Sequence, residues 1–161
     1  MPLHAVLDEA KSIVEFLYQK LGEDLIAVAL FGSCARGDFH AGSDIDLLVI
    51  AQNLPANRVD RLMFLNDIII SCHVRKWPGF VAKTRKEFMS DFPALYLDFG
   101  LDAKVLYDSH GFLRQCLERI REITAEAGLY RVSTAHGFSW RWKKRPKRGW
   151  EITWEGYREL S

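Results

Sequence analysis

Seven consecutive apolar residues, Leu25–Phe31, end abruptly at Gly32 and Ser33. The run is too short for a buried helix, and it predicts a strand that is covered on both faces. A polar stretch follows, and a second run from Asp44 to Ile50 becomes apolar after two acidic positions. Buried strands of this kind need helices to cover their sheet, so the chain is expected to form a mixed α/β or α+β domain.

Helical patterns surround these two strands. Apolar residues from Val6 to Leu21 recur at three- and four-residue steps and predict a helix that Gly22 ends. The clearest amphipathic helix begins at Phe112 and is closed by Gly128. The other expected elements are a helix from Arg58 to about Arg75, a strand Phe80–Lys83, a helical segment Glu87–Phe99 interrupted by Pro93, and an extended piece Lys104–Tyr107. A strand over 67–74 remains an alternative, because that segment contains three consecutive isoleucines.

Composition excludes several functional classes. The chain has 161 residues with 22 Lys and Arg against 21 Asp and Glu, so its net charge of +1 provides no global field to attract nucleic acid or an anionic membrane. No apolar run approaches the roughly 20 residues of a membrane-spanning helix, and the first residues do not form a signal peptide pattern. We therefore expect a cytoplasmic protein with no membrane partner. Cys34, Cys72 and Cys116 fit neither a disulfide framework nor a zinc motif, and free thiols are expected.

The turn after the first strand has the chemistry of a phosphate site. Gly32 lacks a Cβ, so a bulky anion can approach its backbone closely. Ser33 offers a hydroxyl and a backbone N–H at a strand-to-helix turn, where proteins often hold phosphates. Arg36 lies one helical turn later and can add a positive charge. Taken singly, an ordinary turn and a surface arginine are the simpler interpretations.

Two carboxylates open the second strand. Asp44 and Asp46 are two residues apart, so both side chains point to the same face, with Cα atoms roughly 6–7 Å apart. Like charges so placed repel each other unless a cation joins them, and Mg²⁺ prefers such hard oxygen ligands. A solvated strand start is the alternative for the pair alone. Beside a phosphate turn, however, the pair indicates phosphoryl or nucleotidyl transfer from a metal-bound nucleoside triphosphate.

The combined pattern resembles the nucleotidyltransferase superfamily related to DNA polymerase β, and most closely its minimal nucleotidyltransferases. The family elements present here are Gly32-Ser33, then Ala35-Arg36-Gly37, and after a polar spacer Ser43-Asp44-Ile45-Asp46-Leu47. The resemblance is strong over 28–50 and weaker from there to about Gly128. It implies the nucleotidyltransferase fold, a small mixed β-sheet flanked by helices.

The resemblance also implies a reaction. Gly32 and Ser33 would hold the triphosphate, while Asp44 and Asp46 would act as the catalytic residues that bind Mg²⁺ or Mn²⁺. A nucleoside monophosphate would move from ATP or another NTP to a hydroxyl acceptor on a protein or a small molecule, with release of pyrophosphate. Because members of the group often pair with HEPN-domain proteins, such a protein is an expected partner.

One element of the family pattern is missing. Active members carry a third carboxylate on a later strand, but the expected strand Phe80–Lys83 contains no acid. The remaining candidates in the sequence are Glu87, Asp67, Asp98 and Asp102. If none of them reaches the site, the alternative function is a catalytically degenerate, antitoxin-like protein that binds a nucleotide and a HEPN-type partner.

The C-terminal region differs from the rest in composition. We expect a nucleotidyltransferase domain over 1–128 and a basic, Trp-rich extension over 129–161, packed on that domain or appended to it. Its segment 140–148 interleaves two tryptophans with six Lys and Arg residues, a pattern that can bind a polynucleotide. A solvated hairpin loop whose tryptophans pack on the domain is the favoured interpretation, and nucleic acid the less favoured partner.

Overall fold

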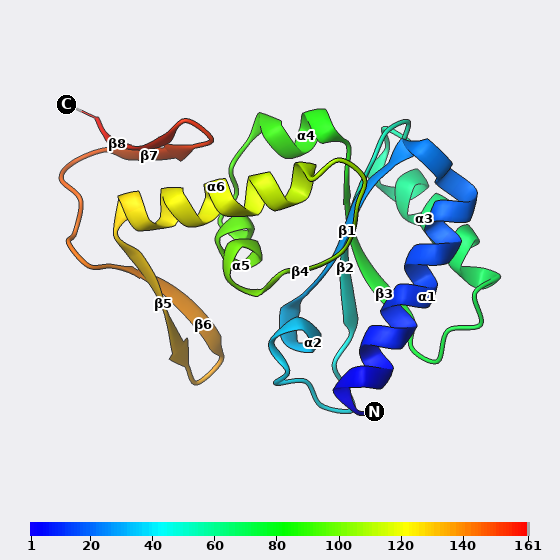
Figure 1. Ribbon diagram of the computed structural model, residues 1–161. Coiled ribbons are helices and arrows are strands. Elements are labelled where there is room, and N and C mark those ends of the chain that lie inside the picture. The colour runs from blue at the N-terminus through cyan, green and yellow to red at the C-terminus, as the bar shows by residue number, and fades with distance from the viewer. Residues whose placement is uncertain (161) are drawn as a thin grey trace.

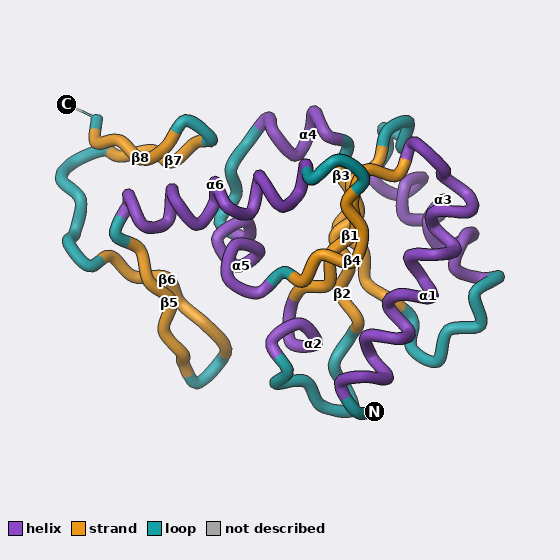
Figure 2. Tube along the Cα trace, viewed as in Figure 1, coloured by secondary structure: helices purple, strands orange, loops and turns teal. Residues whose placement is uncertain are grey.

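The computed structural model describes residues 1–160 and is built around a four-stranded mixed sheet of order β3-β2-β1-β4 (Figures 1 and 2). Strand β1 pairs antiparallel with β2 and β4, and β2 pairs parallel with β3. The strand bounds are β1 Leu25–Phe31, β2 Ile45–Ala51, β3 Pro78–Lys83 and β4 Lys104–Asp108.

Helices cover both faces of this sheet. Helices α1 and α3 lie on one face, and α4, α5 and α6 lie on the other (Figure 1). The short α2 follows β1 at the end of the sheet near the N-terminus (Figure 1). The helix bounds are α1 Leu3–Leu21, the 3-10 turn η1 Gly22–Asp24, α2 Gly32–Arg36, α3 Arg58–Ile70, α4 Arg85–Ser90, α5 Leu95–Asp102 and α6 Phe112–Ala127.

The central strands are buried on both faces, as their apolar runs predict. Val28 and Leu30 of β1 belong to the core under α1 and α3, whereas Ala27 and Ala29 belong to the core under α5 and α6. This alternation follows the two-residue period of a strand. The expected fold class, a small mixed sheet flanked by helices, is therefore confirmed.

Several element boundaries differ from expectation, and one of them matters for the site. Helix α3 ends at Ile70, before the expected Arg75, and the alternative strand over 67–74 is wrong. Strand β3 begins at Pro78, two residues before the expected start. A proline is compatible with the first residue of an edge strand, where its missing N–H breaks no sheet hydrogen bond. This earlier start places Gly79 in register with Asp46.

The last residues form two hairpins beside α5 and α6 (Figure 1). Trp140 and Trp142 pack with Ile152 and Tyr157 against a small core that includes Leu97. Across residues 1–160 no helix combines the length and apolar character needed to cross a membrane. The hairpin strands are β5 Leu129–Thr134, β6 Gly137–Trp142, β7 Trp150–Thr153 and β8 Gly156–Glu159.

Candidate nucleotide and metal site

The site begins at the turn between β1 and α2. Gly32 has a φ of +71°, a conformation that glycine adopts without the steric penalty of a side chain. The last residue of β1, Phe31, pairs with Asp46 of β2. The structure therefore brings the Gly32-Ser33 turn beside the second of the two predicted metal-binding carboxylates.

The Asp46 carboxylate lies between two glycines. A Cβ on Gly32 would stand 2.7 Å from Asp46 Oδ2, and a Cβ on Gly79 would stand 3.0 Å from Oδ1. Both distances are shorter than ordinary van der Waals contact, so any side chain at either position would push against the carboxylate. The two glycines thus form a slot that fixes where the Asp46 oxygens lie.

The electrostatics of Asp46 fit a group that functions with a cation. Burial raises the pKa of its half-buried carboxyl, the Asp44 charge raises it further, and Arg36 opposes both effects. The two carboxylates therefore interact across the same site, as the sequence predicts. Each negative charge disfavours the other, and a bound cation would relieve this repulsion.

Asp44 is held through its backbone. It lies exposed in the loop just before β2, one residue outside the strand in which it was expected. The Cys34 thiol of α2 donates a hydrogen bond of 3.2 Å to the Asp44 carbonyl, which connects the helix after the Gly32-Ser33 turn to the loop that carries Asp44. Burial raises the pKa of Cys34, so this thiol remains a neutral donor. Ser43 closes the loop, since its buried hydroxyl accepts from the His40 N–H at 2.9 Å.

Arg36 ends α2, and its charge lowers the otherwise raised pKa of Asp46. Its Nε contacts Asp38 at 3.2 Å and its Nη1 contacts Asp102 at 3.3 Å. Its side chain is 23% exposed, so the guanidinium still reaches solvent. The structure therefore gathers all five predicted site residues, namely Gly32, Ser33, Arg36, Asp44 and Asp46, around the ends of β1 and β2.

Strand β3 does not supply the third carboxylate that the family pattern would place beside Asp44 and Asp46. The strand contains no acid, and the position beside Asp46 is Gly79. Glu87, the candidate closest to β3 in the sequence, forms a bidentate ion pair with Arg61 at 2.7 and 2.8 Å and also caps α4. These contacts lower the pKa of Glu87 to about 2.

Of the other three candidates, only Asp102 contacts a predicted site residue, through Arg36 Nη1 at 3.3 Å. Asp67 is an exposed residue of α3. Asp98 and Asp102 lie on α5, where both carboxylates accept hydrogen bonds from Arg131 of β5. No local pattern in the sequence indicates this pairing, because Arg131 lies 29 positions from Asp102.

Glu87→Gln is expected to lower the free energy of unfolding at neutral pH by about 1 kcal/mol, because it weakens a partly exposed ion pair and a helix cap. Nucleotide transfer should not change. The pKa of Glu87 is lowered in the folded state, so its stabilisation is present at neutral pH and disappears as the pH falls from about 4 toward 2. Urea unfolding of both proteins at pH 7 and pH 3 measures this difference. A large loss of transfer without a loss of stability would instead assign Glu87 to the reaction.

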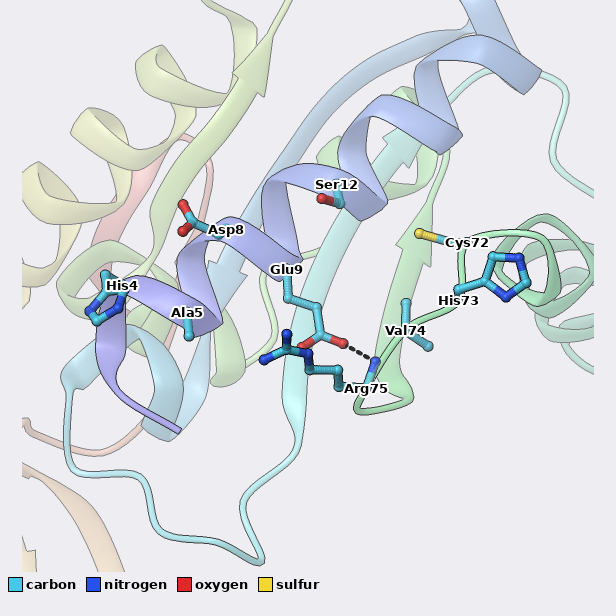
Figure 3. A pocket seen from close by; sticks show the side chains of 9 residues that line it. All are labelled: His4, Ala5, Asp8, Glu9, Ser12, Cys72, His73, Val74 and Arg75. Carbon is cyan, nitrogen blue, oxygen red and sulfur yellow. Dashed lines mark hydrogen bonds between the residues drawn. The ribbon is translucent and has the colours of Figure 1, made fainter.

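A separate pocket of about 380 Å³ lies between α1 and segment 72–75 (Figure 3). None of the five predicted site residues lines it. Within it, Glu9 accepts hydrogen bonds from the backbone N–H groups of Arg75 and Lys76. Glu9 therefore anchors the segment that leads into β3, and it helps to place Gly79 only indirectly.

The tryptophans of the C-terminal region are largely occupied by packing. Trp154 donates to the carbonyl of Asp91 at 2.9 Å and packs against Phe88 and Tyr96. Trp142 contacts Trp150 at a ring distance of 4.9 Å. Trp140 and Trp154 thus contact the preceding domain, whereas Trp150 is exposed and contacts Trp142 within the extension. The basic residues of 143–148 lie in the connection between the two hairpins and not in the hairpin turn that was expected.

Comparison with known proteins identifies the class. The family model for the nucleotidyltransferase domain matches residues 7–93. A candidate protein adenylyltransferase of Methanocaldococcus jannaschii is 37% identical over 124 residues, which are 75% of this chain and 82% of that protein. The chain therefore belongs to the nucleotidyltransferase domain family, and its enzyme class is nucleotidyltransferase.

A solved structure supports the fold independently. A chain of a toxin–antitoxin complex with AMP-PNP superposes with a TM-score of 0.50 and 18% sequence identity, covering 72% of this chain and 90% of that chain. At this identity the likeness concerns the fold alone. The family match ends at residue 93, so it leaves out α5, α6 and both hairpins.

Proposed function

We propose that the chain transfers an adenylyl group from ATP to a hydroxyl group of a protein, with release of pyrophosphate. One observation carries the proposal: the Gly32 turn and the Asp46 carboxylate meet in a slot where no side chain fits between them. Family membership supports the reaction class, and the Methanocaldococcus relative, a candidate protein adenylyltransferase, supports the choice of nucleotide and acceptor.

The site residues fit a divalent metal ion. Asp44 and Asp46 supply hard oxygen ligands, and burial together with the Asp44 charge raises the pKa of Asp46, effects that a bound cation would offset. Asp44 and Asp46 would hold Mg²⁺ or Mn²⁺. When bound, the ion neutralises charge on the triphosphate and helps to align it for displacement.

The remaining residues would bind and orient the triphosphate. Gly32 lets the phosphates approach the backbone, and Ser33 offers its hydroxyl and N–H at the start of α2. Arg36 lies at the end of the same helix and would offset the negative charge of the phosphates. Cys34 and Ser43 keep this turn and the Asp44 loop in place through hydrogen bonds.

The proposal is tested with ATP labelled at the α-phosphate, Mg²⁺ and candidate acceptor proteins. Any small helical HEPN-type protein encoded beside this chain is the first acceptor to test, because the fold likeness extends to a chain of a toxin–antitoxin complex. Label that stays on the acceptor after denaturation, and that requires a divalent ion, supports the proposal. A label retained from the γ-phosphate instead would indicate a kinase-type reaction and overturn it.

A second candidate function follows from the missing acid on β3. With Gly79 beside Asp46, the chain would bind Mg²⁺ and ATP without efficient transfer and act by binding a HEPN-type partner. Calorimetry separates the two candidates. Binding of ATP in the presence of Mg²⁺ together with no pyrophosphate release in the presence of the partner favours the second.

A further inference from the structure

Hairpin β5–β6 lies outside the family match, yet it reaches Arg36, at the end of the short helix that follows the proposed phosphate turn. The connection is Asp102, at the end of α5, whose side chain is 8% exposed. Its Oδ2 accepts hydrogen bonds from Arg36 Nη1 at 3.3 Å and from Arg131 Nη1 at 2.6 Å, and its Oδ1 accepts from Arg131 Nη2 at 2.8 Å. One buried carboxylate therefore joins an arginine of the site to an arginine of the hairpin.

Phe138 makes a second connection between the same two arginines. Its ring centroid lies 4.8 Å from Arg36 Cζ and 4.3 Å from Arg131 Cζ. Arg131 pairs with Trp140 across the hairpin, so Phe138 shares their face two positions along β6. Trp140 Nε1 donates to Asp98 at 3.2 Å, which fixes this face of the hairpin against α5.

The distances show that the two arginines share Asp102 unequally. Arg131 makes a short bidentate contact with Asp102, the geometry of the strongest Arg–carboxylate pairs. It also donates a third hydrogen bond to Asp98 at 3.0 Å. Arg36 makes one longer contact to Asp102. Its other carboxylate partner, Asp38, is 52% exposed, so water weakens that ion pair. The guanidinium of Arg36 is oriented by these contacts but not neutralised.

We propose that Arg131 is a positioning residue: by neutralising Asp102, it leaves the Arg36 guanidinium available to the phosphates of a nucleoside triphosphate. Without Arg131, the nearly buried Asp102 would keep Arg36 as its principal cation and draw it away from the phosphates. The inference rests on the proposed function, since it concerns the same phosphate site. It assigns a role in that site to a strand beyond the matched residues.

The test measures MgATP and AMP affinity of the full chain by calorimetry. Arg131→Met is expected to weaken MgATP binding about tenfold, the effect of losing one charged hydrogen bond, while AMP binding changes less. Arg131→Lys should give a smaller loss. The double variant Arg131→Met/Asp102→Asn should recover affinity to within about threefold of the wild type, because the carboxylate that captures Arg36 is then neutral. In transfer assays KM for ATP should rise while kcat stays nearly constant.

Arg119→Met is the matched control. Arg119 docks the other hairpin by donating to the carbonyls of Trp154 and Glu155 at 3.1 and 2.8 Å, and it should leave MgATP affinity unchanged. Unchanged affinity in Arg131→Met overturns the inference. A double variant as weak as the single one also overturns it, because lost docking of β5–β6 would explain that result. An equal loss in Arg119→Met overturns it as well, because a general effect of loosening the C-terminal hairpins would then be sufficient. A wild-type chain that binds no triphosphate overturns the proposed function, and this inference with it.

Discussion

Asp46→Asn should reduce adenylyl transfer by about 10³-fold or more, because one metal ligand contributes several kcal/mol to transition-state stabilisation. Asparagine has nearly the same shape as aspartate, so the contacts with Gly32 and Gly79 remain and the fold should persist. Pyrophosphate release and label transfer at saturating MgATP measure the effect. A loss of less than tenfold would remove Asp46 from the reaction.

Asp67→Asn provides the matched control for Asp46→Asn. It makes the same chemical change at an exposed position of α3, away from β1 and β2. Transfer by this variant should equal that of the wild type. If both variants lost activity equally, the loss would come from a general effect of removing a negative charge.

The raised pKa of Asp46 also predicts that Asp46→Asn stabilises the fold while it removes activity. In the metal-free protein, burial and the Asp44 charge disfavour the ionised carboxyl in the folded state. Folding stability at neutral pH should therefore be lower than with a neutral group of the same shape, and Asp46→Asn should raise the thermal midpoint as it removes activity. Mg²⁺ should stabilise the wild type and not the variant. Because the pKa of Asp46 is raised, protonation of this carboxyl should weaken metal binding at a higher pH than protonation of an ordinary aspartate would.

The members of the proposed site are close together in the chain, so their placement near one another could be predicted from the sequence. Gly32 to Arg36 and Asp44 to Asp46 lie on a strand end, a short helix and the next strand, so local chemistry and strand periodicity were sufficient to place them near one another. The sheet covered on both faces followed from the two apolar runs. The end of α3 was less predictable, because Ile68–Ile70 suits a helix or a strand.

The remaining features depend on long-range pairing. Gly79 approaches Asp46 because β3 pairs parallel with β2 and begins at Pro78. The sequence Trp77-Pro78-Gly79 is instead typical of a segment that ends a helix. Arg131 reaches Asp102 because a hairpin folds back on α5. Neither contact has a local signal in the sequence, since partners so far apart are chosen by tertiary packing.

Gly32→Ala is expected to reduce transfer by about 10²-fold, because misplacing a reacting group by about 1 Å has effects of this size. The new Cβ would stand 2.7 Å from Asp46 Oδ2, so the carboxylate must move. The φ of +71° adds backbone strain, which should lower the free energy of unfolding by about 1–2 kcal/mol. Transfer assays and urea unfolding measure the two effects separately.

Alanine variants of two further glycines distinguish the effect of backbone strain from the effect of a Cβ contact with Asp46. Gly37 has a φ of +84° and nothing within 4 Å of a Cβ, so Gly37→Ala should reproduce the loss of stability while transfer remains near that of the wild type. Gly79→Ala has no such backbone strain but places a Cβ 3.0 Å from Asp46 Oδ1, so it should lose transfer with little loss of stability. If transfer followed stability across the three variants, strain alone would account for Gly32→Ala. If transfer instead followed the distance to the Asp46 oxygens, the slot around this carboxylate would be what the reaction requires.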